Sequence, residues 1–209
     1  MNKTKINAIV VADSINSWGN RITSLLVTMP RLVLAEFNTH RMFSRNTSSS
    51  RAIPFNKVLE DIRENMFVPL AFQSHHSGMQ GSEYLMGEES EKAKQQWIES
   101  GLRACEEAER LYNLGVTKQL CSRIIEPFGY AKILITATEF NNFFELRCPK
   151  YWVGNPTMYP KRSWKDLVKE MQEQGFDSKP SITTYGVLDK LKFDQSQAEI
   201  HIQALAEAM

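Results

Sequence analysis

The sequence has few cysteines, no long apolar run and no excess of charge of either sign. Its three cysteines are odd in number and widely spaced, which argues against a disulfide framework or a zinc site and favours reduced thiols in a cytoplasmic protein. The longest apolar runs, such as residues 133–135, are far shorter than the ~20 residues that a membrane helix requires. Between the first five residues and Asp13 there are only six apolar or small residues, so we expect no signal peptide.

Charge is balanced over the whole chain but not along it. The 209 residues include 25 Lys/Arg and 24 Asp/Glu, a net charge of +1, which argues against a basic coat for nucleic acid. Residues 1–51 carry seven basic and two acidic residues, a net +5, whereas residues 52–126 carry eight and twelve, a net −4. We therefore expect small phosphorylated ligands at a local site, and no nucleic-acid polymer or membrane as a partner.

The length and the average composition are typical of one compact α/β or α+β unit with a core large enough to fold unaided. The apolar patterns predict strands at 5–12, 21–28 and 130–138, and helices at 30–42, 54–66, 88–114, 116–125, 139–147, 163–174 and 195–209. Residues 44–51 lack apolar periodicity and predict a loop. The proline-containing stretch 148–196, with one clear helix, predicts an inserted subdomain. The last helix has no C-cap, so we expect the natural chain to continue past Met209.

The segment Thr39–Arg51 is the richest in chemical groups. It contains three arginines, one histidine, six hydroxyls and one amide, and it has no acidic residue. Arginine forks and hydroxyls bind phosphate oxygens, and a loop after a helix can add backbone N–H groups. The preceding helix could display Glu36 and His40 together. We interpret the segment as a nucleotide phosphate site, with a solvated polar loop and a nucleic-acid contact as alternatives.

Four elements, in order along the chain, resemble the flavin-dependent (alternative) thymidylate synthases, the ThyX family. That family has an Arg-His-Arg motif, seven further residues and a serine- and arginine-containing end, which correspond here to residues 39–41 and 49–51. Residues 123–127 resemble its Arg-x-x-x-Pro element, and residues 136–147 resemble its flavin-contacting segment. Residues 197–200 are similar to the Gln-x-Glu-Ile start of its late helix.

The resemblance covers residues 20–147 and 197–209 and implies a fold and an assembly. The fold would be α+β, with a central mixed or antiparallel sheet flanked by helices, and the protein would be a homotetramer with active sites at subunit junctions. Residues 1–147 and 197–209 would form the family domain, and residues 148–196 would be the insert.

The resemblance also implies a reaction, in which methylene-tetrahydrofolate supplies a carbon, NADPH reduces FAD, and dUMP becomes dTMP. No protein nucleophile is needed, and no metal is expected. The residues implied to contact FAD are His40, Arg41, Thr136, Thr138 and Asn142. The residues implied to contact dUMP are Glu36, Thr39, Ser48, Ser49, Ser50, Arg51, Arg123 and Arg147. Of these, Arg147, near the uracil, and Ser49 are the catalytic candidates.

Some positions depart from the family pattern. Thr39 replaces the first arginine of the motif, Thr47 stands where glutamate is usual, and His201 stands where arginine is common. Two alternatives therefore remain. One is a related enzyme with another substrate or product, such as dCMP or a 5-hydroxymethyl nucleotide. The other is a non-catalytic protein that binds nucleotide or flavin.

Overall fold

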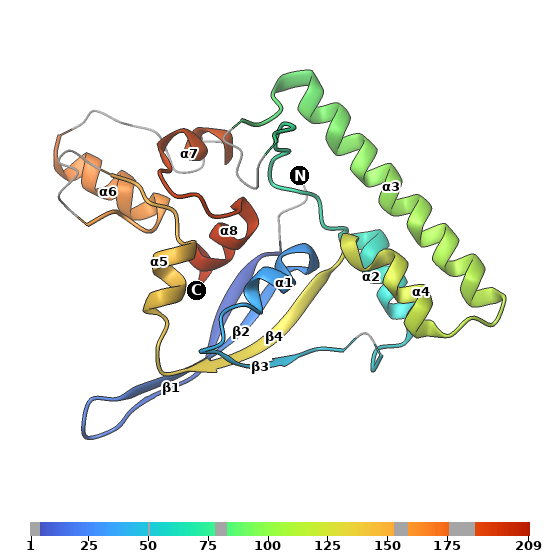
Figure 1. Cartoon of the computed structure of the whole chain (residues 1–209), viewed down its shortest axis with the longest axis horizontal. Helices are drawn as coiled ribbons and strands as arrows, with labels where there is room; N and C mark the ends of the chain where they lie inside the picture. The colour runs from blue at the N-terminus through green and yellow to red at the C-terminus, as the bar shows by residue number, and fades with distance from the viewer. Residues whose placement is uncertain (1–4, 50, 78–82, 153–158, 176–186) are drawn as a thin grey trace.

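The computed structural model describes residues 5–49, 51–77, 83–152, 159–175 and 187–209. These residues contain a four-stranded sheet in the order β1-β2-β4-β3, with helices on two sides of it (Figure 1). All three strand pairs of this sheet are antiparallel. The expected α+β class is thus confirmed, with an antiparallel rather than a mixed sheet. No helix in the described part of the chain is long and apolar enough to cross a membrane.

The elements have the following bounds along the chain. The strands are β1 Asn7–Ile15, β2 Arg21–Pro30, β3 Ser44–Thr47 and β4 Tyr130–Ala137. The α-helices are α1 Leu34–Phe37, α2 Phe55–Asn65, α3 Gly87–Asn113, α4 Lys118–Ile125, α5 Asn141–Arg147, α6 Trp164–Glu173, α7 Val187–Phe193 and α8 Ile200–Ala208. Two 3₁₀ turns, η1 Arg31–Val33 and η2 Glu126–Phe128, precede α1 and β4.

One face of the sheet forms the main core. Val27 of β2 pairs with Ile133 of β4, and Leu25 pairs with Ile135, so all four side chains point to the same face. They are 0–4% exposed and belong to one core cluster with Ile202 of α8. Alternating burial is the pattern of a strand with one covered face. Burying each such side chain contributes about 1.5–3 kcal/mol, so this face fixes the register of the strands that carry the site.

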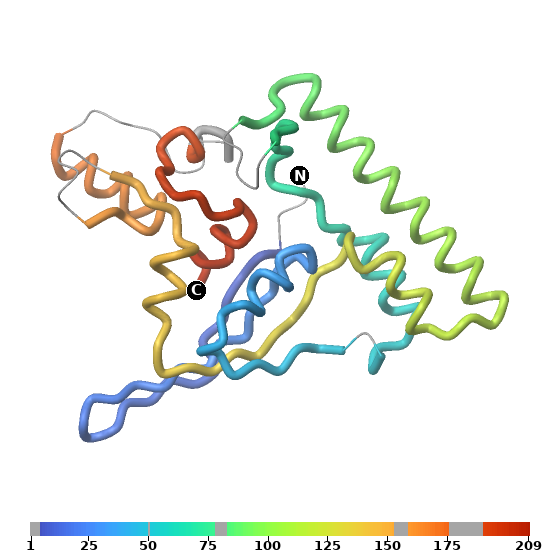
Figure 2. Tube along the Cα trace, in the orientation of Figure 1, coloured from blue at the N-terminus to red at the C-terminus, as the bar shows by residue number. Residues whose placement is uncertain are grey.

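The opposite face of the sheet has apolar side chains in solvent. Ile9 pairs with Leu26, and Leu26 pairs with Leu134, so the three form one row across β1, β2 and β4. They are 37–55% exposed. The β1–β2 hairpin runs on past the other strands (Figure 2) and turns at Gly19, whose φ of +83° suits glycine. An apolar row of this kind is suited to contact with another polypeptide.

Helices α2, α3 and α4 form a second core beside the sheet (Figure 1). The buried residues of this core are Phe55, Leu59, Ile62, Met66, Cys105, Ala108, Cys121 and Ile125. Gly101 of α3 marks the closest approach, because a Cβ there would lie 2.6 Å from Met66 Sδ and 2.9 Å from Phe128 Cδ1. The predicted helices 54–66, 88–114 and 116–125 are confirmed to within a residue or two.

The described part of residues 148–196 has a small core of its own. Tyr151, Trp164, Leu167 and Val168 are buried together. Ser163 caps α6 as predicted, because its Oγ accepts the N–H of Asp166 at 3.1 Å. Helix α7 is absent from the predicted elements, because its seven residues are too few for a helical period to stand out. The division of the chain into a family domain and an insert stays a prediction.

The helix predicted over 30–42 is wrong in length, because the chain forms only η1 and α1 and leaves the helix at Phe37. Thr39 Oγ1 donates to the Glu36 carbonyl at 2.7 Å. Arg45 Nη1 donates to the Asn38 carbonyl at 2.8 Å. The backbone after Phe37 closes i→i+3 bonds, since the N–H of Thr39 donates to the Glu36 carbonyl at 3.0 Å and that of His40 donates to the Phe37 carbonyl at 3.2 Å, and the two side chains supplement these bonds.

The loop predicted over 44–51 is also wrong at its start. Residues 44–47 form β3, which pairs with β4 from Ser44 opposite Thr136 to Thr47 opposite Ile133. Its exposed and half-buried residues alternate, and an edge strand tolerates polar side chains. Smaller differences lie at β1, which continues to Ile15, and at α8, which begins five residues later than predicted.

Candidate functional site

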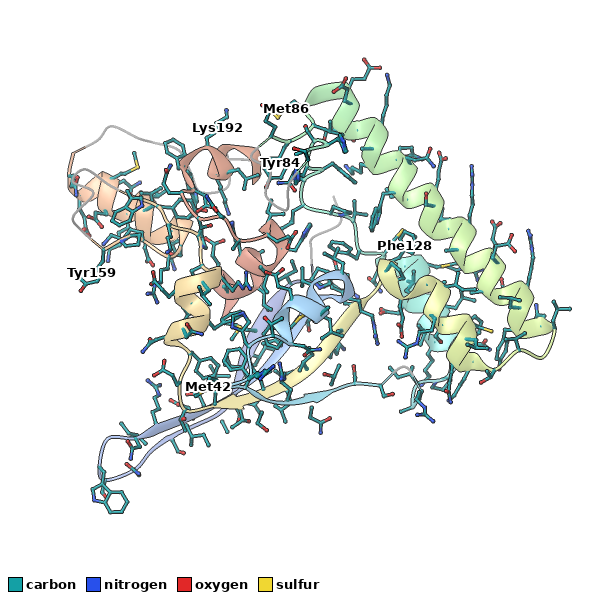
Figure 3. All side chains as sticks on the ribbon, in the orientation of Figure 1. Met42, Tyr84, Met86, Phe128, Tyr159 and Lys192 are labelled. Carbon is teal, nitrogen blue, oxygen red and sulfur yellow. The ribbon has the colours of Figure 1, made fainter. Side chains whose placement is uncertain are left out.

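Two cavities meet at Arg147, which lines both of them. The larger has a volume of about 870 Å³, and the smaller has about 340 Å³. Both lie in the size range of small-molecule sites. Residues that line the larger cavity include Glu36, Tyr84, Trp97, Asp194, Glu199 and His201. Those that line the smaller include Thr39, His40, Arg41, Met42, Asn142 and Phe143. Figure 3 shows Tyr84 between α7 and the start of α3, and Met42 near the sheet below α5.

Arg147, at the end of α5, joins two residues from the other side of the site. Its Nη1 lies 2.6 Å from Glu36 Oε1, and its Nε donates to His40 Nε2 at 3.1 Å. Nε2 therefore carries no proton, and the proton of a neutral His40 ring is on Nδ1. The side chains of Arg147 and Glu36 are 23% and 30% exposed, so water screens this ion pair less than a surface pair. We call Glu36, His40 and Arg147 the Arg147 cluster.

The surroundings shift the pKa values of both partners of Arg147. Burial raises the pKa of Glu36; the charge of Arg147 lowers it, and that of Glu199 raises it. Burial also lowers the pKa of His40, and the charges of Arg147 and Arg45 lower it further. At neutral pH the cluster therefore holds a neutral imidazole beside a carboxyl group whose basicity is increased.

The early end of α1 positions the cluster. Arg45 Nη1 donates to backbone carbonyls that follow α1, among them that of His40 at 3.3 Å, and so stabilises the turn. The His40 ring lies edge-on to Phe143 with centroids 4.8 Å apart, and it stacks on Phe43 at 6.2 Å. The sequence predicted that Glu36 and His40 would be neighbours on one helix. Instead, Arg147 of α5 links them across two elements.

The structure brings together three of the five residues that were expected to bind FAD. His40, Arg41 and Asn142 all line the smaller cavity. Thr136 does not line it, because its side chain lies on the opposite face of β4, where Oγ1 is 2.7 Å from Ser24 Oγ. Thr138 is exposed just after β4 and lines neither cavity.

The residues expected to bind dUMP fall into two groups. Glu36, Thr39 and Arg147 lie at the two cavities. The other described candidates lie elsewhere. Ser48, Ser49 and Arg51 follow β3, and Arg123 is on α4, which precedes β4, whereas Arg147 is on α5, which follows β4 (Figure 1).

Within that second group, the described side chains are exposed. Ser48 donates its backbone N–H to the Lys132 carbonyl at 3.0 Å, and Ser49 Oγ accepts the N–H of Arg51 at 3.2 Å. Arg123 pairs with Glu126 at 2.8 Å. Ser50 lies outside the described residues. Within one chain, the described phosphate-binding candidates therefore do not reach the Arg147 cluster.

The sequence did not identify Asp194, Glu199 and His201 as polar residues that line the larger cavity, where they form what we call its polar wall. His201 Nε2 accepts the N–H of Leu70 at 3.0 Å, so Nδ1 carries the proton and donates to Glu199. The Oε2 atom of Glu199 accepts the N–H groups of His201 and Ile202, which caps α8. The Gln-x-Glu-Ile element pointed to this helix start but not to the cavity.

Asp194 accepts hydrogen bonds from several segments that form the polar wall. Its Oδ1 accepts the N–H groups of Lys150 and Ser196 at 2.8 and 2.9 Å. Its Oδ2 accepts Ser196 Oγ and Gln203 Nε2, both at 2.8 Å. One carboxylate thus joins both ends of the segment 148–196 to α8, and no sequence pattern signals such a contact.

Comparison with solved structures finds a UMP/dUMP methylase, PolB from Streptomyces cacaoi, in two forms. The form with bound 5-Br dUMP matches with a TM-score of 0.56 and 12% identity, over 93% of this chain and 98% of PolB. The form with bound 5-Br UMP matches with a TM-score of 0.51 and 18% identity, over 83% and 89%. No protein-family model and no curated protein matches the sequence. The chain is therefore similar to PolB in fold.

Proposed function

We propose that this chain is an FAD-dependent thymidylate synthase that methylates dUMP to dTMP with methylene-tetrahydrofolate and NADPH. The observation that carries the proposal is the Arg147 cluster at the boundary of two cavities, because it gives two ligands a common contact. The four ordered sequence elements support the same reaction. The fold shared with a UMP/dUMP methylase is further support.

The smaller cavity fits a flavin by the chemistry of its lining. It combines a neutral imidazole, a guanidinium and an amide with the Phe143 ring, and flavin rings need both polar contacts and apolar surface. We propose that His40, Arg41 and Asn142 hold FAD there, without Thr136 and Thr138, which line neither cavity. When bound, FAD accepts electrons from NADPH and supplies the redox chemistry, and the protein supplies orientation and charge.

We propose that the nucleotide phosphate binds residues 48–51 together with Arg123. Ser48, Ser49, Arg51 and Arg123 lie at the opposite end of β4 from Arg147, so one chain holds them apart from the Arg147 cluster. A homotetramer, as the ThyX resemblance implies, would join the halves across subunit junctions. Arg147 would then stabilise charge that develops on the uracil carbonyls, and Ser49 would orient the nucleotide.

The cysteines fit a reaction without a protein nucleophile. All three are free and buried. Burial raises the pKa of Cys105, and it raises the pKa of Cys148 to about 11. Since the thiolate is the nucleophilic form, neither thiol is activated at neutral pH.

The proposal is tested with purified protein and added FAD. A flavin absorbance spectrum and conversion of dUMP, with methylene-tetrahydrofolate and NADPH present, are the expected results. Protein that stays colourless with added FAD would contradict it. Arg51→Ala should weaken dUMP binding about 10–100-fold, since a hydrogen bond to a charged group contributes about 1.5–3 kcal/mol. The matched control is Arg103→Ala, on the exposed side of α3, which should leave binding unchanged.

A further inference from the structure

The charged groups that line the larger cavity are mostly acidic. The carboxylates of Glu36, Asp194 and Glu199 line it, and among the described residues Arg147 is the one arginine or lysine that does. The guanidinium of Arg147 is already paired with Glu36, at 2.6 Å. A phosphate or another anion is therefore disfavoured in this cavity, and a neutral ligand that carries hydrogen-bond donors is favoured.

The protein uses the hydrogen-bonding capacity of two of these carboxylates to different extents. A carboxylate accepts up to about four hydrogen bonds, two at each oxygen. Asp194 accepts four from the protein and is saturated. Glu199 accepts two at Oε2 and one at Oε1, the latter from His201. Because its side chain is 37% exposed, Oε1 of Glu199 can accept one more hydrogen bond from a ligand.

Tyr84 adds a hydrogen-bond donor to the same cavity. Its side chain is half-buried and lines the cavity, and its hydroxyl has no hydrogen-bond partner among the described residues. Burial raises the pKa of Tyr84, and the charges of Glu199 and Asp194 raise it further. The phenol is therefore protonated at neutral pH and can donate to a ligand.

Two aromatic rings, of Phe72 and Trp97, also line the cavity. Their centroids lie 6.5 Å apart, with the rings edge to face. The indole N–H of Trp97 donates to the Phe67 carbonyl at 2.7 Å, so the ring offers the cavity apolar surface. Aromatic surface next to a carboxylate acceptor and a phenol donor suits a flat heteroaromatic ring with polar groups along one edge.

The order of donors and acceptors along that edge decides which ring suits Glu199. A uracil or a flavin presents one N–H between two carbonyl oxygens, and a carboxylate would repel those oxygens. A 2-amino-4-oxopteridine presents an amino group, a ring N–H and then a carbonyl oxygen, which match a carboxylate acceptor and a phenol donor. Guanine has the same edge, but GMP would bring a phosphate into an acidic cavity.

We propose that the larger cavity binds the pteridine ring of methylene-tetrahydrofolate, an assignment that rests on the proposed function. Oε1 of Glu199 accepts a hydrogen bond from the 2-amino group, and Tyr84 donates its hydroxyl to the 4-oxo group. Phe72 and Trp97 cover the ring. The co-substrate then shares a cavity with Arg147, where the proposed function has the uracil.

The test measures binding of tetrahydrofolate, which lacks the transferable carbon, by isothermal titration calorimetry with FAD and dUMP added. Tyr84→Phe removes only the hydroxyl and should weaken binding about 3–10-fold. Glu199→Asp keeps a capping carboxylate, since Asp is a favoured N-cap, but withdraws it from the cavity, and it should weaken binding by about tenfold. The control Tyr159→Phe, at a side chain that is 94% exposed and outside both cavities, should bind as wild type.

A tetrahydrofolate analogue without the 2-amino group separates recognition of the ring from a structural role of Glu199. Wild-type protein should bind the analogue about tenfold more weakly than tetrahydrofolate, and Glu199→Asp should lose most of that difference. GMP should not compete with tetrahydrofolate. Equal affinity of the wild type for both folates, or competition by GMP, would overturn the assignment.

The outcomes distinguish this site from the proposed function. If the wild-type protein forms dTMP but Tyr84→Phe and Glu199→Asp bind tetrahydrofolate as tightly as wild type, the folate site is wrong and the proposed function stands. If the wild-type protein binds no tetrahydrofolate, the folate site is also wrong. If tetrahydrofolate binding depends on Tyr84 and on the 2-amino group in a protein that forms no dTMP, the folate site is supported and the proposed function has failed.

Discussion

Arg147 offers the clearest energetic test of the site, because it connects Glu36 to His40. Replacing it with methionine keeps much of the apolar stem but removes both contacts, at 2.6 and 3.1 Å. A hydrogen bond to a charged group contributes about 1.5–3 kcal/mol, and partial exposure reduces that value. We expect Arg147→Met to lower the free energy of unfolding by about 2 kcal/mol. For a chain of this size, the melting temperature should fall by about 4–8 °C.

The assay is urea unfolding of a double-mutant cycle made from Arg147→Met and Glu36→Gln. A direct contact should give a coupling energy of about 0.5–2 kcal/mol. The control is Arg103→Met, because Arg103 is 74% exposed and lies 3.8 Å from Glu99, so it should change stability by less than about 0.5 kcal/mol. Additive effects of the two site variants, with no coupling, would refute the cluster.

Three further predictions concern Asp194, Gly101 and the pH dependence of stability. Asp194→Ala removes the acceptor of four hydrogen bonds and should cost about 2–4 kcal/mol in urea unfolding, with Asp194→Asn milder; equal stability of both variants and wild type would contradict the shared-acceptor role. Gly101→Ala should destabilise, because overpacking against Met66 costs about 1–3 kcal/mol and the gain in helix propensity is about 1 kcal/mol; a higher melting temperature would show that Met66 yields freely. Folding lowers the pKa of His40, so below pH 6.5, its pKa in the unfolded chain, the unfolded state binds the proton more readily. The free energy of unfolding should therefore be highest above pH 6.5 and fall as the pH drops below it. His40→Gln should remove that part of the pH dependence.

The elements that could be predicted from the sequence are those with a strong local pattern. The strand at 130–138 and the long helix 88–114 have apolar periods that packing preserves. The cap at Ser163 depends on a contact three residues away, which local sequence can reveal. The resemblance likewise pointed to Glu36, His40 and Arg147 one by one.

The parts that could not be predicted depend on contacts that are distant in sequence or that override a pattern. His40 and Arg147 are 107 residues apart, so their contact has no local signal. The predicted helix 30–42 is too long because the backbone turns into i→i+3 bonds after Phe37, where the Thr39 and Arg45 side chains also donate to the last carbonyl oxygens. Residues 44–47 looked like a loop because their strand is polar, and only the edge of β4 makes it a strand.

The most direct test of the central claim is the mass of the product formed from dUMP. The protein is incubated with FAD, NADPH, methylene-tetrahydrofolate and either dUMP or dCMP, and the nucleotides are analysed by mass spectrometry. A thymidylate synthase should convert dUMP to a product heavier by one CH₂ group and leave dCMP unchanged. A product heavier by CH₂O, modification of dCMP in place of dUMP, or unchanged dUMP with flavin bound would contradict the account.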